Sequence, residues 1–221
     1  MAAQMKSNSD LQLKRYNLRS SSSANYCFGL YTKRSKMLEN DLNGVVEPID
    51  PFMQKYVDFG NKHEKSGVAK WILMNKKMPQ DILDNQMNYI IQNFLNLKGD
   101  TVVDLSCTPD GISGDTLLEI KCGKLGERPY TSKEITRYYP QIYLQQYILN
   151  SLGVEINQTH LVSWSLNGTK VWELKRNVEF EIFMLSLLEE YSMALLSQGE
   201  LRDKPEKYTG DYDIKLIYGD E

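Results

Sequence analysis

The most constraining feature of this sequence is a charged pair set among aliphatic residues, shortly after a Pro-Asp-Gly turn. The turn is Thr108-Pro109-Asp110-Gly111, and the pair lies in Leu118-Glu119-Ile120-Lys121. Side chains alternate between the two faces of a β-strand, so Glu119 and Lys121 point the same way. A carboxylate and an ammonium among aliphatic neighbours are costly to bury unless they are paired or bound to another charge. The segment therefore indicates a functional site.

Two strand-like runs surround this turn. Residues 101–106 and 116–121 are rich in β-branched and aliphatic side chains, and Asp110-Gly111 and Ser113-Gly114 mark a turn between them. We expect the two runs to pair as a hairpin. Asp110 would then lie at its turn, with its carboxylate within reach of Glu119.

Two convergent carboxylates would form the hard, oxygen-rich site that Mg²⁺ prefers, with Mn²⁺ as a substitute. Asp110 and Glu119 would be ligands, and the carbonyl of Ile120 could supply another. Lys121 could orient or help to deprotonate an attacking water and offset charge on a phosphate. Such a metal lowers the pKa of its bound water, so the pattern suits phosphodiester hydrolysis. The alternative is a surface ion pair, which explains most isolated Glu-x-Lys sequences.

Two further polar residues are candidates for the same site. Glu64 lies in a helix predicted over residues 51–75, and its neighbours at helical spacing are small or apolar, which places it on the inward face. An inward carboxylate is costly unless it is paired or bound to metal. Gln141 lies in the first turn of a helix predicted to begin at residue 138. The alternatives are a solvated helix glutamate and an ordinary polar helix position.

The remaining periodicity predicts helices around a sheet. Asp50 caps the first helix and Pro51 suits its first turn. A second helix is expected after Pro79, ending near Gly99, because apolar residues recur at helical spacing there: Leu83, Met87, Ile90, Ile91 and Phe94. Strands over 160–166 and 169–174 form a hairpin through Asn167-Gly168, between helices over 138–152 and 178–197. This order predicts an α/β or α+β domain, with a central mixed sheet flanked by helices.

Composition divides the chain into three parts. We expect a loosely ordered, Ser-rich arm over residues 1–24, one folded domain over 25–200 and a mostly polar tail over 201–221. Residues 1–36 hold seven Lys and Arg residues against Asp10, a net charge of +6, whereas the whole chain has −3. A basic arm on an acidic body can contact phosphates locally, although a solvated tail or an organelle transit peptide has a similar composition.

The cysteines and the hydropathy bear on the compartment. Cys27, Cys107 and Cys122 are too few for a disulfide framework, which favours a reducing intracellular compartment. No apolar run approaches the roughly 20 residues of a membrane-spanning helix, so we expect no membrane partner.

Taken in order, four segments resemble the lambda-exonuclease family, also called YqaJ-like viral recombinases, which includes the herpesvirus-type alkaline nucleases. They are Phe59-Gly60-Asn61-Lys62-His63-Glu64, Thr108-Pro109-Asp110-Gly111-Ile112, Leu117-Leu118-Glu119-Ile120-Lys121-Cys122 and Tyr138-Tyr139-Pro140-Gln141. The resemblance covers roughly residues 50–197. Tyr143 departs from it, because the family has a second glutamine there, and Gly123 replaces a frequent proline.

This resemblance implies a restriction-endonuclease-like core with a PD-(D/E)xK site. Asp110, Glu119 and the Ile120 carbonyl would hold Mg²⁺, and Glu64 would serve a second metal or its water. Lys121 would position the nucleophilic water, and Gln141 would support the site. The implied activity is 5′→3′ digestion of double-stranded DNA, which leaves 3′ single strands for recombination and repair.

The resemblance also implies DNA contacts and partners. In the family an arginine binds the 5′ phosphate; Arg19 before the serine run is the first candidate and Arg34 before Ser35 the second. Arg137 and Tyr138, which follow a basic loop, are further expected DNA contacts. The implied partners are double-stranded DNA ends, a single-strand-annealing protein and further copies of the chain in a homotrimer, although the family also includes monomers.

Two rival functions stay open on the sequence. An endonuclease or an RNA-cleaving enzyme on the same fold would use the same metal site. A DNA-binding module with a decayed active site is the other rival, and the intact set of Glu64, Asp110, Glu119 and Lys121 argues against it.

Overall fold

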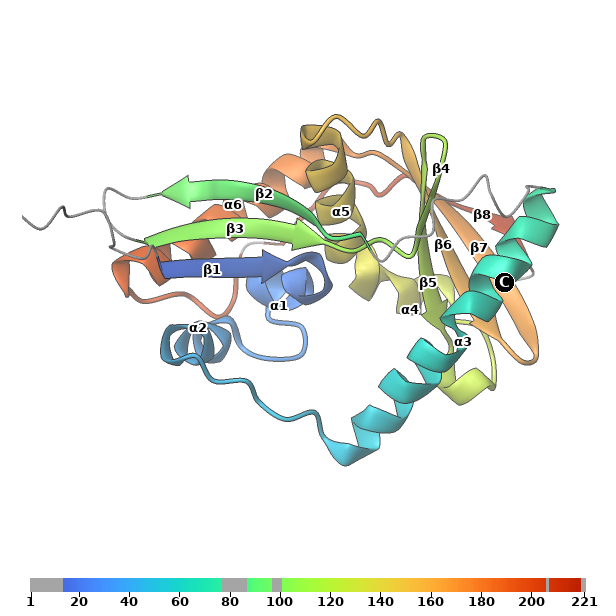
Figure 1. The fold of residues 1–221 in the computed structure, drawn as a ribbon, viewed down its shortest axis with the longest axis horizontal. Coiled ribbons are helices and arrows are strands. Elements are labelled where there is room, and N and C mark those ends of the chain that lie inside the picture. The colour runs from blue at the N-terminus through green and yellow to red at the C-terminus, as the bar shows by residue number, and fades with distance from the viewer. Residues whose placement is uncertain (1–13, 77–86, 97–100, 206, 220–221) are drawn as a thin grey trace, which may run out of the picture.

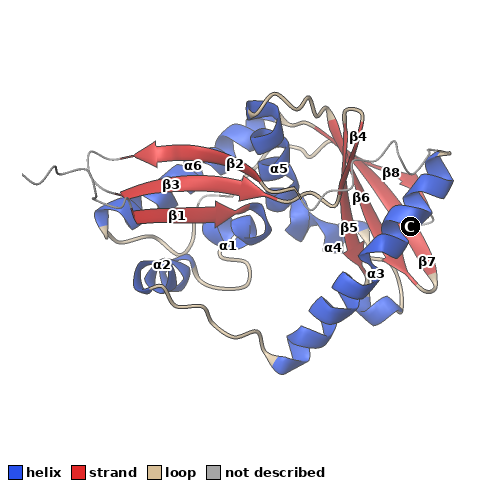
Figure 2. Ribbon diagram, viewed as in Figure 1, coloured by secondary structure: helices blue, strands red, loops and turns tan. Residues whose placement is uncertain are grey.

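The computed structural model describes residues 14–76, 87–96, 101–205 and 207–219. Its strands form two sheets that lie side by side along the long axis of the molecule, as Figure 1 shows. The smaller sheet has the order β1-β3-β2, and the larger has the order β4-β5-β6-β7-β8. Helices cover both sheets (Figure 2), so the fold is the mixed α/β arrangement that the order of elements predicted.

The smaller sheet consists of β1 (Lys14–Arg19), β2 (Tyr89–Asn96) and β3 (Thr101–Cys107). The central strand β3 runs parallel to β1 and antiparallel to β2. The residues of β3 from Val102 to Cys107 are all buried. Apolar residues fill most of this strand, and the buried Asp104 among them is paired with Arg15 and accepts a hydrogen bond from the backbone N–H of Asn93 at 2.8 Å.

The larger sheet consists of β4 (Gly111–Ser113), β5 (Thr116–Cys122), β6 (Gln158–Ser165), β7 (Gly168–Lys175) and β8 (Ile214–Tyr218). β5 and β6 are parallel, and the other neighbours are antiparallel. β4 and β5 form a tight hairpin in which Gly111 pairs with Leu118. Because β4 is short, the end of β5 that carries Glu119, Ile120 and Lys121 continues beyond it.

The helices are α1 (Ser23–Phe28), α2 (Arg34–Asn43), α3 (Pro51–Asn75), α4 (Ser132–Ile135), α5 (Tyr139–Ser151) and α6 (Val178–Ser197). The cap predicted for α3 is present: the Asp50 carboxylate accepts from the backbone N–H of Phe52 at 2.8 Å. Asn177 caps α6 through the N–H of Phe180 at 2.9 Å. The main apolar core packs α5 and α6 against both sheets.

A second, smaller core holds α3 on the larger sheet. Trp71 of α3 is buried with Leu118, Ile120, Val162 and Val171 of the strands beneath it. Gly67 allows this approach, because a Cβ at that position would collide with the Cγ2 methyl of Ile120. Glu64 lies one helical turn before Gly67, so the same close contact holds the Glu64 segment of α3 beside β5.

Several predicted elements are corrected by the structure. Residues 101–106 and 116–121 are strands, but they belong to different sheets, so the hairpin that carries Asp110 is β4–β5 and not the predicted pair. The helix predicted after Pro79 is wrong where it falls within the described residues, because Tyr89–Asn96 is the strand β2. Its first part, residues 79–86, lies outside the described residues.

The hairpin of β6 and β7 is confirmed, but its turn differs from the prediction. Ser165 pairs with Gly168, which makes Leu166 and Asn167 the turn residues. Asn167 has no positive φ, whereas the predicted left-handed turn requires one. Its side chain instead donates to the carbonyl of Glu127 at 2.7 Å, which ties the turn to the loop before α4.

The ends of the chain are more structured than their polar composition suggested. Within the predicted arm, residues 14–24 form β1, a short 3-10 helix (Ser20–Ser22) and the start of α1, with Leu18, Ser20 and Ser23 buried. Residues 1–13 lie outside the described part. In the predicted tail, β8 extends the larger sheet, so both segments belong to the fold rather than flank it.

All three cysteines are free thiols, and Cys27 and Cys107 are buried as small apolar groups, which agrees with the absence of a disulfide framework in the sequence. None of the helices in the described part combines the length and the apolar character needed to span a lipid bilayer.

Arg34 at the start of α2 is fully buried and ties four segments together. Its Nε donates to the carbonyl of Tyr26 at 2.7 Å, and its Nη2 donates to the carbonyl of Leu187 at 3.1 Å. Nη1 donates to the Glu190 carboxylate at 3.1 Å and to the carbonyl of Arg202 at 3.2 Å. A guanidinium without exposed surface is tolerated only because its donors are satisfied in this way.

We predict that Arg34→Ala lowers the free energy of unfolding by about 3 kcal/mol, because it removes the donor of three backbone carbonyls and one of the two arginines paired with Glu190. Urea unfolding followed by fluorescence measures the change. Lys33→Ala is the matched control, since Lys33 precedes Arg34 and is exposed; it should shift stability by less than about 0.5 kcal/mol. Equal effects of the two substitutions would contradict the structural role of Arg34.

Candidate active site

A cleft of about 870 Å³ lies between α3, the end of β5 and the segment that joins α4 to α5. It contains three of the charged residues predicted from the sequence, Glu64, Asp110 and Lys121. Apolar and aromatic side chains from the start of α3 form one wall, and Tyr130, Arg137 and Tyr138 lie on the opposite side. Glu64, Asp110, Ile120 and Lys121 therefore meet at one concave surface, whereas Glu119 and Gln141 do not line it.

Glu119 lies behind the lining of the cleft, against Lys121, and is almost completely buried, with 1% of its surface exposed. Both of its carboxylate oxygens accept hydrogen bonds. The Gln141 amide donates to Oε1 at 2.7 Å, and the Gln145 amide donates to Oε2 at 2.9 Å. Lys121 forms an ion pair with Oε1. These donors compensate the desolvation of a charge that the aliphatic neighbours cannot stabilise.

Lys121 lies on the same face of β5 as Glu119, as the alternation of the strand predicted. Burial lowers the pKa of its ammonium, but the charges of Glu119 and Asp110 raise it by more, so the net shift is upward. Lys121 is therefore held as a cation. Its Nζ lies 5.1 Å from the centre of the Tyr138 ring, which gives the ammonium a second electrostatic contact.

Asp110 lies at the start of the β4–β5 hairpin. Its Oδ2 accepts a hydrogen bond from the backbone N–H of Ile120 at 2.6 Å. Burial raises the pKa of Asp110 well above its ordinary value, and the charges of Glu119 and Glu64 raise it further, whereas Lys121 and the Ile120 bond lower it. The N–H and the carbonyl of a strand residue face the same edge, so the Ile120 carbonyl also faces the side where Asp110 lies.

Glu64 is half-buried on α3 and lines the cleft. Burial raises the pKa of its carboxyl, and the charge of Glu119 raises it further, while Lys121 and Lys65 lower it. Glu64 therefore senses the same charges as Asp110 does. Three carboxylates from α3, β5 and the hairpin thus surround a single ammonium, that of Lys121.

This donor set fits a divalent cation. Burial is the main cause of the raised pKa values of Asp110 and Glu64, and the repulsion between the carboxylates adds to it. Three carboxylates face one ammonium, and carboxylate and carbonyl oxygens are the ligands that Mg²⁺ takes. Within the described residues, no three His, Cys, Asp or Glu side chains are close enough together to hold one ion. A cation here would therefore depend on two carboxylates at most, completed by the Ile120 carbonyl and by water.

The structure separates the four residues predicted to contact DNA. Arg137 and Tyr138 line the cleft. Arg19, at the end of β1, is exposed and lines a smaller hollow of about 270 Å³ that also includes Gln141. The prediction for Arg34 is corrected, because its side chain is fully buried and all of its bonds are made inside the protein.

Gln145 is the site residue that the sequence analysis missed. It is fully buried on α5, one helical turn after Gln141, and it contacts the carboxylate oxygen of Glu119 that Gln141 and Lys121 do not contact. The spacing of four residues between two glutamines was a usable signal, since positions i and i+4 share a helix face. Tyr143, where the resembled family has its second glutamine, packs in the main core instead.

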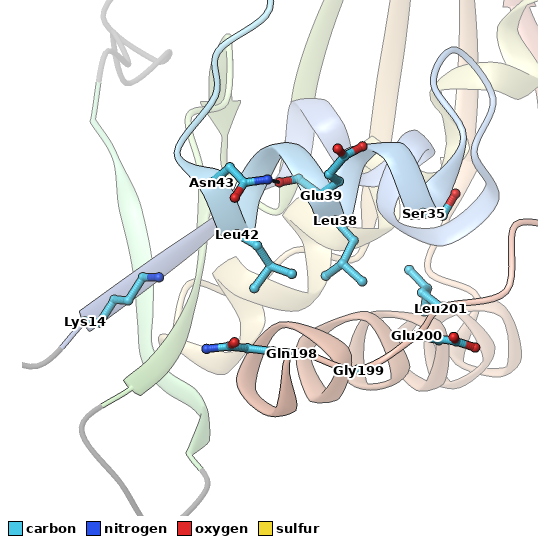
Figure 3. Close-up of a pocket in the computed structure, with 10 residues that line it drawn as sticks. All are labelled: Lys14, Ser35, Leu38, Glu39, Leu42, Asn43, Gln198, Gly199, Glu200 and Leu201. Atoms are coloured by element: carbon cyan, nitrogen blue, oxygen red, sulfur yellow. Dashed lines mark hydrogen bonds between the residues drawn. The ribbon is translucent and has the colours of Figure 1, made fainter.

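Another hollow, of about 590 Å³, lies between α2, the end of α6 and the start of β1, and Figure 3 shows its lining. Leu38 and Leu42 of α2 project toward Gln198 and Gly199 at the end of α6 (Figure 3). It shares no residue with the cleft and contains none of the predicted site residues. We therefore assign the chemistry to the cleft.

No protein-family model matches the chain, and no curated protein sequence matches it. Several solved structures do match it, and two of them are exonucleases. An alkaline exonuclease, LHK-Exo, from Laribacter hongkongensis has a TM-score of 0.58 and 16% sequence identity, over 82% of this chain and 89% of that one. A phage related exonuclease from Haemophilus somnus 129PT has a TM-score of 0.56 and 11% identity, over 83% and 96%. The restriction-endonuclease-like fold implied by the sequence motifs is thus confirmed.

We predict that, in EDTA at neutral pH, Asp110→Asn unfolds at a higher urea concentration than the parent chain does. The amide can still accept from the Ile120 N–H, and one of the repelling charges is gone. Because the folded pKa of Asp110 is raised, the parent loses stability as pH rises from about 4, the unfolded value, toward the raised value. The advantage of the variant should therefore grow across this range and vanish below about pH 4.

The matched control for this experiment is Asp211→Asn, an equivalent change at an exposed position. It should leave the pH dependence of unfolding unchanged. If Asp110→Asn were less stable than the parent at neutral pH, the excess of negative charge in the cleft would be disproved.

Proposed function

We propose that this protein is a Mg²⁺-dependent nuclease that degrades double-stranded DNA from its ends in the 5′→3′ direction and leaves 3′ single strands. The observation that carries the proposal is the arrangement of Asp110, Glu119 and Lys121 on the β4–β5 hairpin, with Glu64 facing them from α3. The fold shared with two structures described as exonucleases supports it. Mn²⁺ is expected to substitute for Mg²⁺.

In this proposal, Asp110, Glu119 and the Ile120 carbonyl would hold the cation, and Glu64 would act on a second ion or through water. When bound, the cation would make a nearby water more acidic and offset the charge of the scissile phosphate. Lys121, kept protonated by its carboxylate neighbours, orients the attacking water and stabilises the negative charge that develops on the phosphate.

Gln141 and Gln145 are positioning residues in this scheme. Each holds one oxygen of Glu119, so the carboxylate has a fixed orientation before any cation or DNA arrives. Preorganised polar groups of this kind lower the reorganisation needed in the transition state. Their position on α5 also links Glu119 to Tyr138 and Arg137, which immediately precede that helix.

The DNA contacts are assigned to the residues around the cleft. We propose that Arg137 and Tyr138 contact the phosphate backbone and that Arg19 receives the 5′ phosphate. Arg19 is exposed in a hollow that it shares with Ser20, Ser21, Thr108 and Gln141. Hydroxyls, backbone amides and a guanidinium are the groups that bind phosphate oxygens.

The proposed partners are double-stranded DNA ends, a single-strand-annealing protein that takes up the product, and further copies of the chain in a homotrimer. The proposed setting is a reducing intracellular compartment, in line with three free thiols. Sedimentation that gives only monomers at working concentrations would remove the trimer.

The main rival is an endonuclease or an RNA-cleaving enzyme, since either would use the same carboxylates and lysine. Covalently closed circular DNA separates the first rival, because it offers no end. Rapid cleavage of the circle would favour the endonuclease. A preference for an RNA duplex over a DNA duplex would favour the second rival.

We predict that Glu119→Gln lowers the rate of duplex cleavage in Mg²⁺ by at least about 100-fold, because it removes a charge needed for the cation while keeping the side-chain shape. Duplex affinity measured in EDTA should be largely unchanged. Glu189→Gln is the matched control, since Glu189 is exposed on α6. A near-parental rate for Glu119→Gln would show that the metal assignment is wrong.

We also predict that the parent cleaves a linear duplex with a 5′ phosphate faster than one with a 5′ hydroxyl, and that Arg19→Ala removes this preference. The reason is the loss of a charge-assisted contact to the terminal phosphate. End-labelled duplexes in Mg²⁺ provide the measurement. Lys14→Ala, at the other end of β1 and exposed, is the control. A preference that survives Arg19→Ala would assign the phosphate to another residue.

A further inference from the structure

Next to the catalytic cleft lies a separate hollow of about 530 Å³ that the cleavage chemistry does not use. Its lining is dominated by aromatic rings, namely Phe28, Tyr139, Phe180, Tyr208 and Tyr212. The rings come from α1, α5, α6 and the segment before β8, so the fold gathers them from distant parts of the sequence. We call this hollow the aromatic pocket.

The aromatic pocket and the cleft share one wall. Arg137 lines both. On one side of the wall Leu30 lines the pocket and Tyr31, the next residue, lines the cleft. On the other side Tyr138 faces the cleft and Tyr139 the pocket. A nucleic-acid strand that leaves the cleft past Arg137 therefore enters the aromatic pocket directly.

The rings of the pocket present accessible π surface with a polar group among them. Tyr208 and Tyr212 are only partly buried, and their ring centres lie 5.3 Å apart. Tyr212 packs on Tyr139 at 4.5 Å, and Tyr208 packs on Phe180 at 5.0 Å. The hydroxyl of Tyr208 is buried and has no hydrogen-bond partner among the described residues. Buried tyrosine hydroxyls usually have a partner, so this one is an unsatisfied polar group within the wall of the pocket.

The charge at the rim of the pocket is positive. Arg137, Lys204 and Lys207 line it, and both lysines are exposed. Among the described residues of the lining, the acidic one is Asp203, which already accepts a hydrogen bond from the backbone N–H of Ser35 at 2.9 Å. Arg137 uses its Nε for the carbonyl of Glu134 at 2.8 Å. In the described part of the chain its two Nη groups donate no hydrogen bond, so they are available to a phosphate.

We propose that the aromatic pocket binds an unpaired nucleotide of the DNA substrate, with the base against Tyr208 and Tyr212 and the phosphate toward Arg137 and the two lysines. This inference rests on the proposed function, which places DNA in the neighbouring cleft. A hollow of this size accepts a drug-sized group and excludes a duplex. Aromatic faces beside a cationic rim are the usual means of binding single strands, and stacking contributes about 1–3 kcal/mol per base.

The test measures what a single-stranded tail adds to affinity. Fluorescence anisotropy in EDTA compares a blunt duplex with the same duplex carrying a short thymidine tail. The parent should bind the tailed duplex more tightly, and Tyr208→Ala should reduce this gain by roughly 5-fold to 100-fold, the equivalent of one stacked base. The double variant Lys204→Gln, Lys207→Gln should also reduce it and lower the salt slope by about 1.4.

The lysine variants keep the test decisive if Tyr208→Ala fails to fold. Both lysine side chains are exposed, and their replacement leaves the aromatic cluster intact. The controls are Tyr218→Ala and Lys215→Gln, which change an exposed tyrosine and an exposed lysine of β8 outside the pocket. Both should keep the full gain from the tail. Blunt-duplex cleavage in Mg²⁺ should be unchanged in the lysine double variant.

Photocrosslinking with a bromodeoxyuridine tail gives an independent readout, and the crosslink should map to Tyr208 or Tyr212. A crosslink at Trp164 of β6, which lies outside the aromatic pocket, or a tail gain that is equal in all variants, overturns the inference. So does binding of a proline-rich peptide in the pocket without any gain from the tail. Failure of the parent to cleave any duplex removes the proposed function, whereas the tail gain in EDTA is measured without cleavage.

Discussion

A carboxylate with almost no exposed surface must find its stabilisation inside the protein, and Glu119 finds it from three donors on two elements. Lys121 follows it on β5, while Gln141 and Gln145 reach it from α5. Removing any donor would leave a buried charge underpaired, which is expensive at low dielectric. The position of α5 on the sheet and the position of the charged end of β5 therefore depend on each other.

The same constraint explains how the other charged groups are placed. Gly67 brings α3 onto Ile120, and this contact holds Glu64 across the cleft from the hairpin. The short strand β4 ends before Ile120, which leaves its N–H to Asp110. Each carboxylate thus comes from a different element, and packing rather than sequence proximity makes them interact. Burial raises the pKa of Asp110 and of Glu64, and the charges of the neighbouring carboxylates raise both further.

Much of this could be predicted from the sequence wherever the signal was local. Alternation placed Glu119 and Lys121 on one face, helical spacing turned Glu64 inward, and the Asp50-Pro51 pair marked the start of α3. Predictions failed where tertiary pairing decides. Residues 89–96 carry apolar residues at helical spacing, yet they form backbone hydrogen bonds with β3 as a strand. A bulge between Ile91 and Leu95 shifts the register of this strand pair. Short apolar runs are ambiguous between helix and strand for this reason.

Long-range contacts also decided which polar residues belong to the site. Arg34 looked like a phosphate ligand because it precedes Ser35, but nothing local reveals that Glu190 and the Leu187 carbonyl lie over it. Gln145 is one of several amide side chains of α5, and only the packing of α5 against β5 brings it to Glu119.

The distribution of charge sets the order of binding events in the proposed mechanism. Three carboxylates around one lysine would repel a phosphate, so under the proposed function the scissile phosphate approaches Lys121 only when a divalent cation offsets them, whereas the rest of the duplex can bind without the cation. The positive groups that could attract the duplex backbone before that are Arg137, at the margin of the cleft, and Arg19, in the smaller hollow that also includes Gln141. A protein with net charge −3 can therefore still hold DNA. Its positive side chains lie where a DNA strand would enter and leave, and its carboxylates gather where the divalent cation is needed.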